Sequence, residues 1–91
     1  MTERIRHVLF VCSHNSARSI MAEGILRNLG RGRFVAHSAG SHPADRVHPM
    51  ALRTLGEMHL PTEGYRSKDW AEFAQPGAPA LDFVLTGLMF D

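Results

Sequence analysis

The strongest constraint on the fold is an apolar run at residues 7–11. It is followed, after a gap of only eight residues, by a stretch with helical periodicity. The run is led in by Ile5 and is rich in strand-forming residues, so it predicts a strand buried on both faces, as in a parallel sheet. The stretch at 20–29 predicts a helix that ends at Gly30 and Gly32. Its apolar positions are Met21, Ile25, Leu26 and Leu29. A strand, a loop and a helix are therefore expected in direct succession.

The rest of the sequence continues this alternation. A strand is expected at 33–38, closed by Ala39 and Gly40, and a loop at 41–46. A helix is expected to begin at Pro49, and Pro61 prevents it from continuing. A short helix at 67–73, a turn-rich connection at 75–80 and a strand at 82–86 follow. Leu52, Leu55 and Met58 are the expected buried stripe of the second helix, and Trp70 and Phe73 share one face of the short helix. This order predicts an α/β fold with parallel strands and right-handed crossovers.

Length and composition restrict the class of protein. We expect residues 1–91 to form a single domain, and 44% hydrophobic residues with a net charge of +1 argue against a disordered chain. The basic residues are spread along the chain, so no stripe for nucleic acid is expected. The apolar runs are too short for a signal peptide or a membrane span. A single cysteine excludes an intrachain disulfide and fits a reducing compartment, so we expect a cytoplasmic protein.

The loop at 12–19 carries the chemistry. It follows the carboxyl end of a predicted parallel strand, where such sheets bind their ligands. A strand that feeds a tight loop into a helix turns backbone N–H groups toward one point, and the helix N-terminus adds about half a positive charge there. Arg18 can hold two oxygens of a tetrahedral anion, and the positive potential favours the thiolate of Cys12. The sequence therefore predicts an oxyanion-binding loop around a nucleophilic cysteine.

The remaining loop residues fit the same role. We expect Asn15 to adopt a positive φ and to hydrogen-bond within the loop. Ser19 either donates its hydroxyl to the thiolate or caps the helix. His14 is either a pH-sensitive neighbour of the site or a solvated residue at its rim. The predicted catalytic residues are Cys12, Arg18 and Ser19, and the predicted oxyanion-binding residues are Ser13, His14, Asn15, Ser16, Ala17 and Arg18.

Other interpretations of these residues are less favoured. A cysteine alone is more often a core residue at a strand end than a nucleophile, and an arginine alone is more often on a helix surface. The pair at this spacing, between a strand and a helix, favours the oxyanion site. His37, His42 and His48 fall on or near one loop, but their spacing matches no metal-ligand pattern, so no metal site is expected.

Four segments resemble the arsenate reductase branch of the low-molecular-weight protein tyrosine phosphatase superfamily. In residues 8–23 the loop Asn-Ser-Ala-Arg-Ser is followed by Met-Ala-Glu, which is typical of that branch. The other similar segments are residues 37–43, 61–64 and 81–86. The resemblance extends over residues 5–86, nearly the whole chain.

The resemblance implies both a fold and a reaction. It implies a doubly wound parallel sheet of four strands, of which this sequence supplies three, and attack by the thiolate of Cys12 on an oxyanion held by Arg18. In the phosphatases the product is a phosphocysteine, and in the reductases it is a cysteine–arsenate adduct that a second thiol resolves to arsenite. Asn15 and Ser19 would support the loop and the thiolate, and Glu23 and Ser38 would lie behind the loop.

The sequence departs from the family pattern near residue 91. Leu88 stands about where reductases of this type have a second cysteine, the Asp-Pro general acid of the phosphatases is absent, and nothing places Asp91 near the loop. We interpret residues 87–91 as an early stop or a change of reading frame, and we expect the domain to lack its C-terminal part. The third strand would then have a free edge that favours a homodimer.

Three functions are compatible with these observations. The first is an arsenate reductase-like enzyme without a resident cofactor, which needs an external thiol such as glutathione, mycothiol, glutaredoxin or thioredoxin. The second is a low-molecular-weight phosphatase. The third is a non-catalytic module that binds arsenate or phosphate, with neither nucleic acid nor a membrane as partner.

Overall fold

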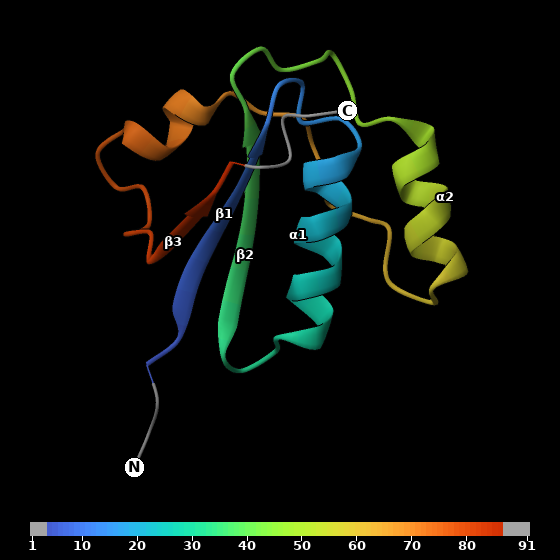
Figure 1. Ribbon diagram of the computed structural model, residues 1–91, viewed down its shortest axis with the longest axis horizontal. Coiled ribbons are helices and arrows are strands. Elements are labelled where there is room, and N and C mark those ends of the chain that lie inside the picture. Colours follow the sequence, from blue (N-terminus) through green and yellow to red (C-terminus); the bar gives the residue numbers. More distant parts are fainter. Residues whose placement is uncertain (1–3, 87–91) are drawn as a thin grey trace.

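The computed structural model describes residues 4–86 as an α/β fold with one parallel sheet (Figure 1). The strands are β1 (Arg6–Cys12), β2 (Phe34–Gly40) and β3 (Phe83–Leu85). The helices are α1 (Arg18–Leu29), α2 (Pro49–Glu57) and the 3-10 helix η1 (Trp70–Ala74). The strand order is β2-β1-β3. The expected α/β class and the three parallel strands are confirmed, and residues 87–91 lie outside the described part of the chain.

The register of the sheet sets where the site lies. The pairing of β1 with β2 extends from Arg6 opposite Phe34 to Cys12 opposite Gly40. The pairing of β1 with β3 is shorter and ends at Phe10 opposite Leu85. Because all the strands run in the same direction, their carboxyl ends meet at one edge of the sheet, and Cys12 stands at that edge beside the last residue of β2.

The two faces of the sheet are covered differently. Figure 1 shows α1 packed on one face with α2 outside it, while η1 lies on the other side of the sheet. On the η1 face a small core forms from buried Leu9, Val11 and Ala39, with Phe73 and Leu81 packed against it. The chain is therefore wound on both sides of the sheet, and the α1 side carries the larger helical layer.

The buried face of α1 differs from the expected apolar stripe. Its buried residues are Ser19, Ile20, Glu23 and Gly24, whereas Leu29 is 72% exposed. At Gly24 the side chain of Leu55 from α2 comes so close that an added Cβ would lie 2.9 Å from its methyl carbons. Met21, Ile25 and Leu26 are half-buried, and the fully buried positions are set by the glycine contact with α2 and by the polar residues behind the loop.

The later elements also correct details of the prediction. In α2, Leu55 is fully buried and Leu52 half-buried, but Met58 is 45% exposed because it follows the last residue of the helix. The short helix begins at Trp70, since the Asp69 carboxylate accepts from the N–H of Ala71 at 2.8 Å and caps it there. Trp70 itself is half-exposed, so only Phe73 of the expected pair packs on the core.

The last described strand is short. Instead of extending over residues 82–86, β3 has three residues, and all of them are exposed. Asp82 precedes it and is tied to β1, because its N–H donates to the carbonyl of His7 and its carboxylate accepts from the N–H of His7. Among residues 4–86 no helix has the length and apolar character needed to cross a membrane.

Candidate oxyanion-binding site

The thiol of Cys12 lies at the bottom of the loop that follows β1. The residue is 7% exposed, and its Sγ is 2.8 Å from the hydroxyl oxygen of Ser19 in the first turn of α1. The backbone N–H of Asn15 also donates to the sulfur, at 3.1 Å. In the contact with Ser19 either the hydroxyl or the thiol can be the donor, whereas the N–H of Asn15 donates to the sulfur. The predicted cysteine, serine and asparagine are thus brought together around one atom.

Asn15 connects the thiol to the rest of the loop. Its φ is 49°, a left-handed conformation that asparagine tolerates better than most residues, and it is fully buried. Its side-chain Nδ2 donates to the hydroxyl of Ser19 at 2.8 Å, and its Oδ1 accepts from the N–H of Lys68 at 2.8 Å. The expected positive φ is confirmed, and both polar atoms of the side chain fasten the loop in this conformation.

The N-terminus of α1 points into the loop without a side-chain cap. The N-cap residue Ala17 makes no side-chain hydrogen bond, and the first turn contains no acidic residue. Ser19, which was also considered as a cap, instead turns toward Cys12 and Asn15. A helix N-terminus in this state presents backbone N–H groups and positive potential to an anion. Arg18 is the first residue of the helix, directly after the loop, and it is exposed.

The carbonyl groups of the loop are held from outside by the segment after β2. The carbonyls of Cys12, Ser13, His14 and Ser16 accept from the N–H groups of Ser41, His42, Ala44 and His48, at 2.7–3.2 Å. Since the carbonyl and N–H of a peptide plane point in opposite directions, this arrangement leaves loop N–H groups on the anion side. The segment passes so close that a Cβ on Gly40 would lie 2.7 Å from the carbonyl oxygen of Ser13.

Behind the loop lies a buried polar cluster. Glu23, on α1, accepts a hydrogen bond from Ser38 Oγ at 2.5 Å and pairs with Arg27. The side chain of Glu23 is 6% exposed and Ser38 is fully buried. Glu23 and Ser38, the two residues expected behind the loop, therefore contact each other in a buried position. Sequence reasoning missed Lys68, whose N–H reaches Asn15, and Ser67, whose Oγ donates to the carbonyl of His14 at 2.8 Å.

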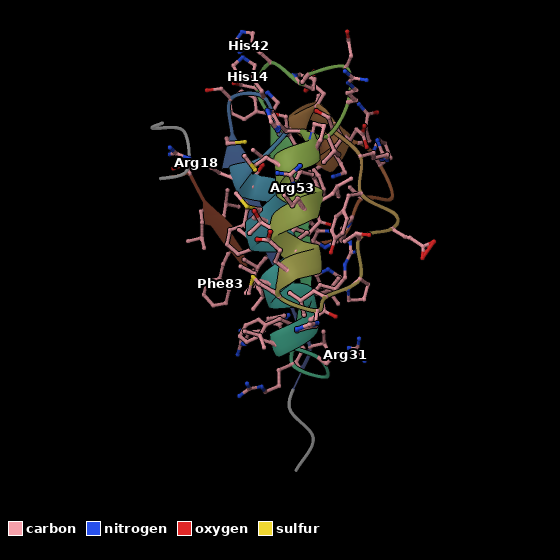
Figure 2. All side chains as sticks on the ribbon, turned by 90° about the vertical axis from the view of Figure 1, so that its right-hand side faces the viewer. His14, Arg18, Arg31, His42, Arg53 and Phe83 are labelled. Carbon is pink, nitrogen blue, oxygen red and sulfur yellow. The ribbon has the colours of Figure 1, made fainter. Side chains whose placement is uncertain are left out.

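The histidines serve separate local roles. Figure 2 shows His14 and His42 at the loop end of the molecule and Arg31 at the opposite end. His48 accepts from the N–H of Met50 and caps α2, while His37 stacks on His7 with ring centroids 5.2 Å apart. Within residues 4–86, no three His, Cys, Asp or Glu side chains gather in a way that suits a metal ion.

A thiol at the carboxyl end of a parallel strand, an anion-binding loop and an arginine at a helix N-terminus define a protein of the cysteine-dependent phosphatase type. The comparison of the sequence with family models agrees with this class. Residues 7–86 match the low molecular weight phosphotyrosine protein phosphatase family, and the chain belongs to that family. The membership expected from the sequence is confirmed.

Individual relatives include both reductases and phosphatases. The chain is 40% identical over 63 residues to the glutaredoxin arsenate reductase of Synechocystis sp. (strain ATCC 27184 / PCC 6803 / Kazusa). The aligned region covers 69% of this chain and 47% of the relative. A solved arsenate reductase in the phosphate binding state has a TM-score of 0.79 and 35% identity, over 90% of this chain and 60% of that one. The low molecular weight protein tyrosine phosphatase from T. tengcongensis has a TM-score of 0.70 and 34% identity, over 89% and 57%. The chain thus spans about half the length of the curated relative.

Proposed function

We propose that this chain is arsenate reductase-like: its loop binds a tetrahedral oxyanion, and Cys12 attacks the central atom. The observation that carries the proposal is the contact of Cys12 Sγ with Ser19 Oγ and Asn15 N, directly before an uncapped helix N-terminus. This geometry supports a thiolate and an anion in adjacent positions. The 40% identity to a glutaredoxin arsenate reductase supports arsenate as the oxyanion.

In the first step the sulfur of Cys12 forms a bond to arsenic. One oxygen of arsenate leaves as water, and the product is a cysteine–arsenate adduct. The hydroxyl of Ser19 and the N–H of Asn15 hold the thiolate in place before the attack. The loop N–H groups and Arg18 stabilise the negative charge on the arsenate oxygens, which is the role that preorganised donors have in such reactions.

In the second step a second thiol attacks Cys12 Sγ. A mixed disulfide forms, the sulfur–arsenic bond breaks with its electron pair on arsenic, and arsenite leaves. A further thiol then reduces the mixed disulfide, so that arsenate and two thiols give arsenite, one disulfide and water. Residues 1–91 contain one cysteine, so these thiols lie outside this segment. Glutathione, mycothiol, a glutaredoxin or a thioredoxin has the required chemistry, and such thiols are kept reduced in the cytoplasm, which we propose as the location.

Phosphatase activity is the second candidate. The match to the phosphatase family model and the 34% identity to the T. tengcongensis enzyme favour it. In that reaction Cys12 takes the phosphoryl group from an aryl ester, the phenolate leaves, and water then hydrolyses the phosphocysteine to release phosphate. The same loop serves both reactions because arsenate and phosphate share charge and shape.

Product analysis separates the candidates. The purified chain is incubated with arsenate and each thiol donor in turn, and arsenite is measured; a parallel sample receives an aryl phosphate. We expect arsenite with at least one donor and none from Cys12→Ser. Arg18→Lys should lower the rate by about 10²–10³ because it loses bidentate contact with the anion. Arg31→Lys, at the far end of the molecule, is the matched control and should leave the rate unchanged.

The contrary outcomes are distinct. Hydrolysis of the aryl phosphate without any arsenite would establish the phosphatase instead. Protection of Cys12 from alkylation by arsenate, without either product, would identify a non-catalytic oxyanion-binding module.

A further inference from the structure

The segment at residues 67–69 crosses the loop from a distant part of the chain. Ser67 Oγ donates to the carbonyl of His14, and the N–H of Lys68 donates to the side-chain oxygen of Asn15, both at 2.8 Å. The carbonyl of Lys68 accepts from the N–H of Gly40 at 2.9 Å. The main chain of Lys68 therefore joins the end of β2 to the residue that gives the loop its left-handed turn.

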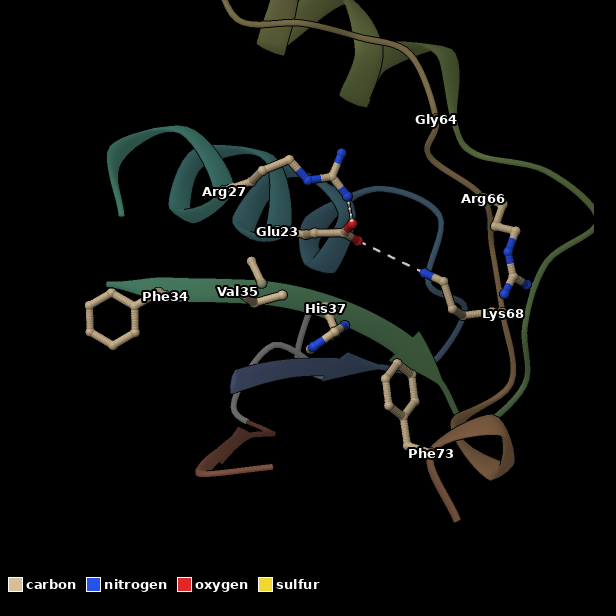
Figure 3. A pocket seen from close by; sticks show the side chains of 10 residues that line it. Glu23, Arg27, Phe34, Val35, His37, Gly64, Arg66, Lys68 and Phe73 are labelled. Carbon is tan, nitrogen blue, oxygen red and sulfur yellow. Dashed lines mark hydrogen bonds and ion pairs between the residues drawn. The ribbon is translucent and has the colours of Figure 1, made fainter. Parts of the chain in front are cut away.

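The side chain of Lys68 extends into the cluster behind the loop. Its Nζ donates to the carbonyl of Ser38 at 2.8 Å and lies 3.9 Å from Glu23 Oε1. Figure 3 shows the Glu23 carboxylate between Lys68 on one side and Arg27 on the other. The Lys68 side chain is 13% exposed, whereas that of Arg27 is 43% exposed. Of the two cations beside Glu23, Lys68 is thus the enclosed one, whose charge water screens less.

This placement of an ammonium is costly and specific. Burial lowers the pKa of Lys68, and the nearby Glu23 carboxylate opposes that effect. Of the ten Lys and Arg residues in the sequence, only Lys68 is a lysine. The compact ammonium of Lys68 lies between the carbonyl of Ser38 and the carboxylate of Glu23.

The negative charge of Glu23 opposes the binding of an anion at the loop. It follows Arg18 in α1 by five residues, a rise of about 7.5 Å along the helix axis. A buried carboxylate at that range repels both a thiolate and a doubly charged oxyanion at the helix N-terminus, because charges interact more strongly where water is excluded. The positive charge of Lys68 offsets this repulsion.

We propose that Lys68 is a positioning residue of the oxyanion site, whose main chain fixes Asn15 and whose ammonium neutralises Glu23 beneath the bound anion. The proposal rests on the proposed function, since it assigns Lys68 a part in anion binding at the same loop. It adds a residue outside the Cys-x5-Arg motif to the site. It also predicts that Lys68 and Glu23 are energetically coupled.

The test is a double-mutant cycle with Lys68→Met, Glu23→Gln and the combined variant. The first readout is the phosphate concentration that half-protects Cys12 from iodoacetamide. The second is the rate of alkylation at pH 7 without phosphate. We expect Lys68→Met to raise the half-protecting phosphate concentration about tenfold and to lower the alkylation rate severalfold, since the charge of Glu23 is then less compensated. The combined variant should return both readouts most of the way to the values of the unmodified chain. Arg31→Met removes an exposed positive charge far from the loop and should change neither the phosphate protection nor the alkylation rate.

The outcomes separate a charge effect from a packing effect. If the combined variant is as impaired as Lys68→Met, or if Lys68→Met behaves like the unmodified chain, the proposal is overturned. Should Lys68→Met fail to fold, Lys68→Arg is used: partial retention of both readouts supports the charge role, and loss as complete as in a Cys12→Ser control overturns it. Absence of arsenite formation by the unmodified chain would refute the proposed reductase activity alone, because the alkylation rate needs neither arsenate nor a thiol donor.

Discussion

The oxyanion loop follows the carboxyl end of β1, and β3 pairs with β1 at one side of the sheet, but the two regions are built in opposite ways. Asn15, Ser19 and Ser38 are fully buried and hydrogen-bonded around the loop. The β3 residues Phe83 and Val84 are 47% and 50% exposed, and the strand pairs only with β1 within residues 4–86. The contrast teaches that the geometry of the site depends on polar contacts from residues 40–48 and 67–69, and little on contacts made by β3.

The largest effect is expected where the backbone packs most closely on the loop. In Gly40→Ala the new Cβ would lie 2.7 Å from Ser13 O and 2.9 Å from Asn15 N, which are main-chain atoms that cannot move away cheaply. We expect a loss of about 2 kcal/mol in unfolding free energy and a loss of oxyanion protection of Cys12, measured by urea titration and alkylation. Gly56→Ala is the control: its nearest contact is 3.8 Å away, so it should be neutral or stabilise α2. Equal effects at both glycines would show that the loop is not tightly packed.

Asn15→Ala tests the polar contacts themselves. The change removes the bonds to Ser19 and Lys68 and places alanine at a φ of 49°, so a loss of about 2 kcal/mol is expected. Asn15→Gly tolerates this φ but still lacks the two bonds, and therefore separates the two causes. Asn28→Ala removes the bond to the carbonyl of Gly24 and an exposed bond from Arg31, and it should cost less than about 1 kcal/mol. A Gly variant as stable as the original chain would mean that the hydrogen bonds contribute little.

A smaller, pH-dependent effect is expected at the base of β3. The pKa of Asp82 is held below its usual range, mainly by the hydrogen bond from the N–H of His7 and to a smaller extent by the Arg4 guanidinium. Because the folded pKa is lowered, the stabilisation is present above the pKa of the unfolded chain and disappears as the pH falls through the folded pKa. Asp82→Asn should therefore be less stable than the unmodified chain at pH 6, and the difference should begin to shrink near pH 4 and disappear as the pH falls through the folded pKa. Urea titrations across this range check it, with exposed Asp45→Asn as the control. A difference that does not change with pH would contradict the charge argument.

The smallest effect on the folded chain is expected within β3. Val84→Lys places a charge on a half-exposed strand, so it should change the unfolding free energy by less than about 0.5 kcal/mol and leave Cys12 protection unchanged. If two copies of the chain associate through the side of β3 that has no strand partner among residues 4–86, the same variant lowers the sedimenting mass at high concentration. Val35→Lys on β2 is the matched change and should leave that mass as it is. Impaired anion binding in Val84→Lys would remove the distinction between the two regions.

Sequence patterns predicted the parts of the molecule that depend on local order. The strand before Cys12, the helix after it and the positive φ of Asn15 follow from residues close together in the chain, and the structure has all three. The buried face of α1 did not follow, because Glu23 and Gly24 are turned inward by partners far along the sequence. Apolar periodicity cannot identify a face whose buried groups are polar and satisfied.

The contacts from residues 67–69 could not be predicted from the sequence for the same reason. Ser67 and Lys68 lie 53 positions away from the loop residues they bond. Neither stands in a recognisable motif, and a lone lysine in a polar stretch is ordinarily a surface residue. Only the three-dimensional path of the chain brings Lys68 to Asn15.

These distant contacts also determine when the site can form. Because Asn15 is held by Lys68, and β1 by Asp82 at a separation of 75 positions, a growing chain cannot complete the loop until these distant residues have been synthesised. Parallel pairing over such separations carries a large loop-closure entropy and slows folding relative to local structure. The thiol of Cys12 therefore leaves the ribosome before Lys68 and Asp82, and it acquires its full surroundings only after both of them have been made.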